Sequence, residues 1–112
     1  MVRSSALAGA MLFGAPVIVA NDSRAQGLDA DAVLNKMPPE QQTAYVAGVV
    51  EGLAYARFQR DKPDEAGMQC IYSWFYGSGE GKWQAIESWF SRYPKQPAGV
   101  LLYVLIKREC GE

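Results

Sequence analysis

Seven consecutive apolar residues, Val100–Ile106, constrain the fold more than any other part of this 112-residue chain. Apolar side chains avoid water, so the run must be buried, and its length alone permits either a strand or a helix. Its flanks favour a helix, because Pro97 suits a first helical turn and Lys107 suits the negative end of the helix dipole. Gly111 suits a C-terminal cap. We expect a central helix over residues 97–110, buried on nearly all sides.

Prolines and apolar spacing predict the rest of the fold. The residue before a proline disfavours the helical conformation, so a short first helix ends before Pro38, and Pro39 opens a longer one. The expected helices cover residues 29–37, 39–60, 64–76 and 80–93. The predicted fold class is all-α: a small single-domain helical bundle of four main helices plus a short N-terminal helix, with one disulfide.

The first 25 residues have the features of a secretory signal peptide. Arg3 supplies the positive start, Ala6–Ala20 is apolar, and Ser23-Arg24-Ala25 fits a small-x-small cleavage pattern. Ile18-Val19-Ala20 is a poorer cleavage site. A retained membrane anchor is the alternative, but the apolar run is shorter than the ~20 residues that a span needs. We expect cleavage near Ala25, a periplasmic location and no stable membrane span after cleavage.

The remaining domain, residues 26–112, has nearly balanced charge. Loss of Arg3, Arg24 and Asp22 leaves 9 of the 11 basic and 11 of the 12 acidic residues, a net charge of −2. The basic residues form no patch and are not interleaved with the aromatic ones. We therefore expect no nucleic-acid binding.

Export changes the interpretation of the two cysteines. An even pair in a small exported domain is usually a structural disulfide, and only Cys70 with Cys110 can form it. Closing a loop of about 41 residues stabilises the fold by roughly 4 kcal/mol in the chain-entropy model. The chain contains no histidine, so we expect neither a zinc site nor a cysteine–histidine catalytic pair. No metal or cofactor is predicted.

The long second helix contains a ridge of small residues. Ala44, Gly48, Gly52 and Ala56 fall at every fourth position beside an apolar stripe. Each glycine inside a helix costs about 1 kcal/mol relative to alanine. We therefore expect another helix or an aromatic ring to pack closely against this ridge. Contact between a ligand and the glycine backbone is the less favoured alternative.

Aromatic residues exceed what the predicted core stripes require. Exposed aromatic side chains are frequent anchors of protein interfaces, although such residues more often complete a core. We predict a partner surface formed by Tyr55, Tyr72, Tyr76 and Trp89.

Several segments follow one another in a recognisable order. The signal leads to Tyr45-Val46-Ala47-Gly48-Val49, then to a mid-chain cysteine, to the segment from Ser88 to Pro94, and to Cys110 at the end of an apolar helix. This order resembles the small periplasmic helical proteins of the Rap/Tai group. These are immunity proteins that neutralise cell-wall amidase toxins delivered by type VI secretion. The resemblance covers residues 37–112 and implies a helical fold, the periplasm and a secreted toxin as partner. The resemblance assigns an inhibitory role to no residue of this chain.

Three function classes follow from these features. The preferred one is a non-enzymatic binding protein with a protein partner in the cell envelope, a second copy of the chain being a further candidate. The alternative is an Hde-like acid-stress chaperone, which would need clustered carboxylates, whereas here they are spread along the chain. An enzyme using paired carboxylates among Glu51, Glu80 and Glu87 is least favoured, because nothing places two of them on one cleft face.

Overall fold

Five helices build the part of the chain that the computed structural model describes, residues 27–112, and this part contains no strand. They are α3 (Ala30–Lys36), α4 (Pro39–Asp61), α5 (Ala66–Tyr76), α6 (Gly81–Arg92) and α7 (Ala98–Cys110). The predicted all-α class is confirmed, and each helix lies close to its predicted bounds. The expected signal peptide and its cleavage near Ala25 fall outside the described residues. No described helix is long and apolar enough to cross a membrane.

Local sequence signals set the ends of these helices. The Asp29 carboxylate caps α3 by accepting a hydrogen bond from the Ala32 backbone N–H at 2.8 Å. Pro39 occupies the first turn of α4, where its missing N–H is harmless. Gly111 follows α7 with φ 77°, a left-handed conformation that favours glycine, and its N–H bonds to the Lys107 carbonyl at 2.9 Å.

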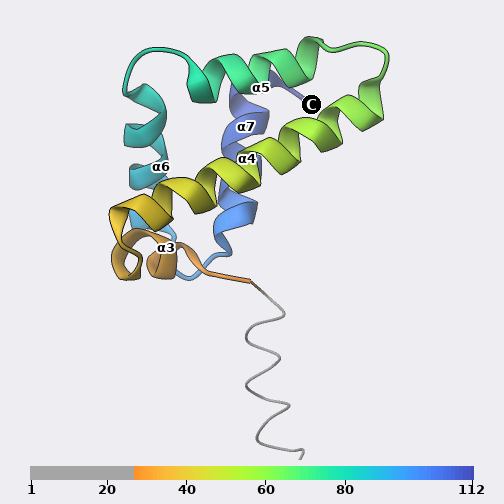
Figure 1. Cartoon of the computed structure of the whole chain (residues 1–112). Helices are drawn as coiled ribbons and strands as arrows, with labels where there is room; N and C mark the ends of the chain where they lie inside the picture. The colour runs from red at the N-terminus through yellow and green to blue at the C-terminus, as the bar shows by residue number, and fades with distance from the viewer. Residues whose placement is uncertain (1–26) are drawn as a thin grey trace, which may run out of the picture.

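Two antiparallel helix pairs cross each other in the fold (Figure 1). One pair consists of α4 and α5, and the other of α6 and α7, with α7 passing behind α4 in this view. The short α3 packs against α6, α4 and α7. Backbone hydrogen bonds tie its start to the α6–α7 connection, since Ala30 N–H donates to the Gln96 carbonyl at 2.8 Å and Ala98 N–H to the Leu28 carbonyl at 2.9 Å.

The core draws on all five helices. Its largest fully buried side chains are Phe90, Ile71, Leu102, Val33, Val46 and Val50. α4 reaches this core through Val46, Val50 and Ala54, one side of a helix whose remaining surface is more open. Burial of this apolar surface provides most of the drive for folding.

The prediction that α7 is buried on nearly all sides is wrong. Its buried residues are Ala98, Leu101, Leu102, Leu105 and Ile106. Val100 and Tyr103, within the same apolar run, are 49% and 45% exposed. The neighbouring helices cover only part of α7, so the rest of it faces outward. Tyr93, the residue that follows α6, is likewise 39% exposed.

Candidate functional site

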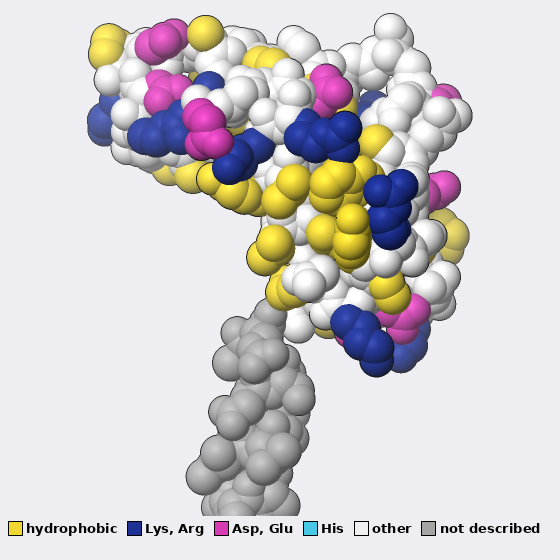
Figure 2. Space-filling view, turned by 180° about the vertical axis from the view of Figure 1, so that it is seen from behind, with side chains coloured by type: hydrophobic (Ala, Val, Ile, Leu, Met, Phe, Trp, Pro, Cys, Tyr) yellow, Lys and Arg dark blue, Asp and Glu magenta, His cyan; other side chains and the backbone are white. Residues whose placement is uncertain are grey.

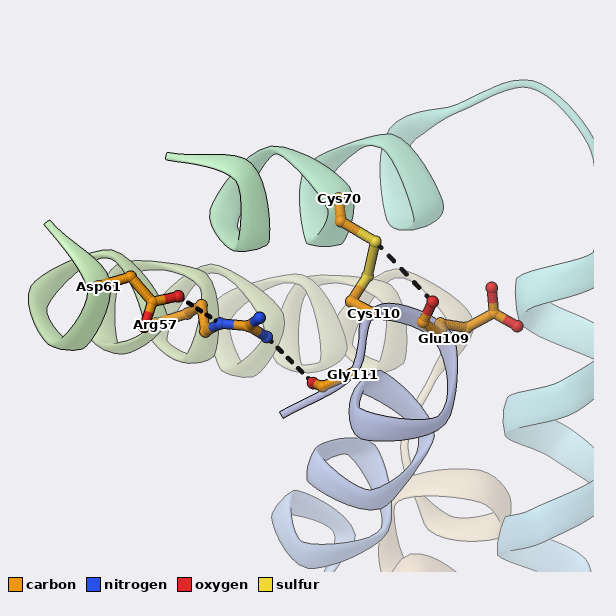
Figure 3. The surroundings of a disulfide bond; sticks show 6 residues. All are labelled: Arg57, Asp61, Cys70, Glu109, Cys110 and Gly111. Atoms are coloured by element: carbon orange, nitrogen blue, oxygen red, sulfur yellow. Dashed lines mark hydrogen bonds and ion pairs between the residues drawn. A yellow bond between two sulfur atoms is a disulfide. The ribbon is translucent and has the colours of Figure 1, made fainter. Parts of the chain in front are cut away.

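The predicted disulfide between Cys70 and Cys110 is present. Its sulfur atoms are 2.02 Å apart and the two Cα atoms 5.8 Å apart. Cys70 lies in the middle of α5 and Cys110 ends α7, so the bond joins helices from the two crossed pairs (Figure 3).

Arg57 fastens the same end of α7 to α4 and lies beside the disulfide in Figure 3. Its Nε donates to the Asp61 carboxylate at 2.7 Å and its Nη1 to the Gly111 carbonyl at 3.1 Å. The Arg57 side chain is only 15% exposed. Arg60 also donates to Asp61, at 2.9 Å, and the hydrogen bonds from Arg60 and Arg57 hold the pKa of Asp61 below its usual value.

The close helix packing predicted for the small-residue ridge of α4 is not found among the described residues. Ala44, Gly48, Gly52 and Ala56 are all exposed. A Cβ atom added to Gly48 or Gly52 would meet no atom within 4 Å. The ridge lies on a different face of α4 from the buried residues.

Three of the four predicted partner-surface aromatics meet beside this ridge. Tyr55 on α4 and Tyr76 on α5 are 59% and 54% exposed. The Tyr76 hydroxyl donates to the Glu51 carboxylate at 2.5 Å, which raises the pKa of Tyr76, and Glu51 lies one helical turn before Tyr55. The Tyr72 ring centre is 6.2 Å from that of Tyr76. We call this surface, formed by Glu51, Tyr55, Tyr72 and Tyr76, the tyrosine face.

Trp89, the fourth predicted aromatic, does not belong to the tyrosine face. It lies on α6, half-buried against the core, with the Arg108 guanidinium 5.2 Å from its ring centre. A cavity of about 280 Å³ opens here between α5, α6 and α7. Its lining includes Trp74, Ser88, Trp89, Arg108 and Glu109.

A groove between α4 and α7 went unpredicted. Its volume is about 190 Å³, and its lining is Leu53, Ala56, Arg57, Arg60, Ile71, Tyr103, Ile106, Lys107, Gly111 and Glu112. Most of this lining is apolar, whereas the end near the C-terminus of α7 is charged. Figure 2 views the molecule from this side and shows hydrophobic side chains gathered in the hollow beneath the projecting helix pair, with Lys and Arg side chains along its upper border. We call this feature the α4–α7 groove.

A sequence signal for the groove exists in hindsight. Val100, Tyr103 and Lys107 recur at helical spacing and share one side of α7, apart from the side defined by Leu102 and Ile106. An apolar run covering both sides of a helix offers more surface than one core can bury. This excess of apolar surface predicts an exposed apolar strip on α7, but it does not predict that α4 forms the other side of a groove there.

The described residues contain no group of three or more His, Cys, Asp or Glu side chains that could hold a metal ion. Of the acids considered for catalysis, Glu51 is engaged by the Tyr76 hydroxyl on the tyrosine face, while Glu80 precedes α6 and Glu87 lies within it. In comparisons with known proteins, the chain matches no family model, no curated protein and no solved structure.

Proposed function

We propose that this protein is a non-enzymatic binding protein of the periplasm and that its partner is a secreted cell-wall amidase toxin, which it neutralises by binding. The observation that carries the proposal is the tyrosine face, where Tyr55 and Tyr76 are both more than half exposed. Tyrosine supplies a large amphipathic contact area at low entropic cost and is enriched at binding hot spots. The resemblance to the Rap/Tai group supports the class of partner.

Hydrogen bonds and the disulfide hold the tyrosine face in place before a partner binds. Tyr76 is oriented by its hydrogen bond to Glu51, and Tyr55 accepts a 2.6 Å hydrogen bond from the Gln59 side chain. The helix carrying Tyr76 is held to α7 by the disulfide. Side chains ordered before binding lose less entropy when a partner docks.

The exposed glycines beside the tyrosine face also support the docking of a partner on this side of α4. Gly48 and Gly52 leave a flat stretch of α4 that the described chain itself does not cover. Each costs about 1 kcal/mol relative to alanine in a helix interior. A partner that docks on the tyrosine face could approach the α4 backbone closely at these two glycines, where no other described part of the chain does so.

The side-chain inventory supports binding over catalysis. The chain has no histidine, and its two cysteines are bonded to each other. Neither cysteine is a free thiol, and no imidazole is present to act as a general base at neutral pH.

The test uses the purified wild-type protein to capture partners from the envelope and secreted fractions of its own host. A captured amidase would then be purified and its hydrolysis of peptidoglycan measured with increasing amounts of the protein. We expect complete inhibition near equimolar ratio. The Tyr55→Ala, Tyr76→Ala double variant lacks two expected hot-spot side chains, so we expect it to inhibit about a hundredfold more weakly.

The matched control is Tyr93→Ala, which removes an exposed tyrosine directly after α6. It should inhibit like the wild type. Failure to capture any cell-wall amidase, or equal inhibition by the double variant, would contradict the proposal.

The acid-stress chaperone receives less support. Such a protein needs carboxylates whose pKa shifts on unfolding are large enough to open the fold in acid. The described carboxylates with lowered pKa are Asp31, Asp61 and Glu112. The ion pairs of Asp31 and Glu112 are exposed, where such pairs contribute little, and the pair of Asp61 with Arg57 is partly buried.

A further inference from the structure

We propose that the α4–α7 groove binds a small amphipathic carboxylate, an aliphatic chain ending in a carboxylate group. The groove lies on a different side of α4 from the tyrosine face, so this inference goes beyond the proposed function and does not depend on it.

The floor of the groove suits an aliphatic chain. Ile71 and Ile106 are 1% and 4% exposed and form a closed apolar base, joined by the half-buried Leu53. Tyr103 borders the groove and is itself 45% exposed. An apolar ligand entering here would pack on this floor and remove the exposed parts of Tyr103 and Leu53 from water, which is favourable.

The charged end of the groove suits an anion. Arg57, Arg60 and Lys107 line this end, where Asp61 forms ion pairs with both arginines and the Glu112 side chain pairs with Lys107. These ion pairs leave part of the Arg60 guanidinium unengaged, and this positive group favours an anionic head group at this end of the groove.

Arg60 is the cation best placed to receive a carboxylate. Its side chain is 54% exposed, and only its Nε is engaged, by Asp61 at 2.9 Å. Its two terminal nitrogens make no hydrogen bond to any other described residue, and a guanidinium fork matches a carboxylate in geometry. Arg57, by contrast, is already committed to Asp61 and Gly111 and has a structural role. Lys107, 2.8 Å from the Glu112 carboxylate, would contribute attraction at longer range.

The size of the groove favours a single chain over a protein element. About 190 Å³ lies below the usual volume of ligand pockets and leaves no room for a helix with its side chains. A short fatty carboxylate places its chain over Leu53 and Ile106 and its head beside Arg60. Octanoate is a suitable probe of this class.

The test compares three probes that share one aliphatic chain: octanoate, octanol and octylamine. Each is titrated into the purified, disulfide-intact protein at low salt, and binding is followed by NMR from the methyl groups of Leu53, Ile71 and Ile106. A charge-assisted hydrogen bond predicts that octanoate binds about tenfold more tightly than octanol. Octylamine should bind more weakly than octanol, because its head meets like charge.

Variants separate the head-group contact from the chain contact. Arg60→Gln should bring octanoate to about the affinity of octanol and leave octanol unchanged, and Lys107→Gln should weaken octanoate to a smaller extent. Tyr103→Ala should weaken both probes. Lys62→Gln is the matched control, since Lys62 also lies at the end of α4 but outside the groove lining, and it should change nothing.

Three results would overturn the inference. One is the absence of saturable shifts at the three groove residues. Another is octanol binding as tightly as octanoate. The last is an equal loss of octanoate affinity in Lys62→Gln and Arg60→Gln. Unfolding midpoints matching the wild type would show that the surface variants remain folded.

Discussion

The guanidinium of Arg57 occupies the space that a side chain at Gly67 would need. A Cβ atom on Gly67 would collide with Nε and Cζ of Arg57. The absence of a side chain at Gly67, a buried residue in the first turn of α5, thus lets Arg57 reach both Asp61 and Gly111. One glycine on α5 thereby sets the contact between α4 and the end of α7.

Replacing Gly67 by alanine should destabilise the protein by about 1 kcal/mol. The added methyl group pushes the Arg57 guanidinium away from the Asp61 carboxylate and the Gly111 carbonyl, and the helical preference of alanine offsets only part of this loss. Urea unfolding of Gly67→Ala against the wild type measures the change. In an Arg57→Ala background the same substitution should be neutral or stabilising, because the collision is gone. Equal effects in both backgrounds would refute this account.

Gly48→Ala and Gly52→Ala should each have the opposite effect and stabilise the protein by roughly 0.5–1 kcal/mol. Both positions are exposed in the interior of α4, with open space where a Cβ would lie. Chemical unfolding gives the stability. If a partner docks across the ridge, the same substitutions will weaken inhibition in the toxin assay while raising stability. If either substitution destabilises the protein, this would indicate that another element packs closely against the ridge, as the sequence predicts.

The sequence predicts the helices well because their ends depend on local chemistry. Pro39 and Gly111 act within one turn of their own positions, so their effects are visible without the fold. The pairing of Cys70 with Cys110 was predictable because no other pairing exists. These features need no knowledge of which helices become neighbours.

The candidate surfaces were less predictable, because they depend on how helices cross. Spacing shows that Gly48 and Gly52 share one side of α4, but not whether another helix covers that side. The run containing Val100 and Tyr103 suggested complete burial, yet the packed helices leave one side of α7 open. Likewise, nothing local to Trp89 reveals that Arg108 would lie over its ring, away from the tyrosine face.

Loss of the disulfide should lower the free energy of unfolding by about 4 kcal/mol, because Cys70 and Cys110 close a long loop with a sequence separation of 40. A Cys70→Ser, Cys110→Ser double variant avoids leaving a free thiol and is compared with the oxidised wild type by urea unfolding. The reduced wild type should match the double variant. A change below about 1 kcal/mol would show that packing between α5 and α7 holds this end of the fold without the bond.

Acid should weaken the contact between α4 and the end of α7, to a modest extent. Hydrogen bonds from Arg60 and Arg57 lower the pKa of Asp61, and the hydrogen bond from Lys107 lowers that of Glu112. A carboxylate with a lower pKa in the folded state stabilises the fold above its unfolded pKa, and this stability is lost as pH falls through the folded value. Urea midpoints should therefore fall below about pH 4. Asp61→Asn should be less stable than the wild type near neutral pH and show a smaller acid-induced fall.

Intact mass of the protein from the periplasmic fraction of its host tests export and the disulfide together. Cleavage after Ala25 gives the mass of residues 26–112 less two hydrogens, because the bond between Cys70 and Cys110 removes one hydrogen from each thiol. Alkylation before reduction should add no label, and alkylation after reduction should add one to each cysteine. A Cys70→Ser, Cys110→Ser double variant controls for labelling elsewhere. A full-length mass with both thiols reactive would contradict a periplasmic location. It would also contradict the proposed binding of a secreted amidase, because that binding requires the protein to be in the periplasm.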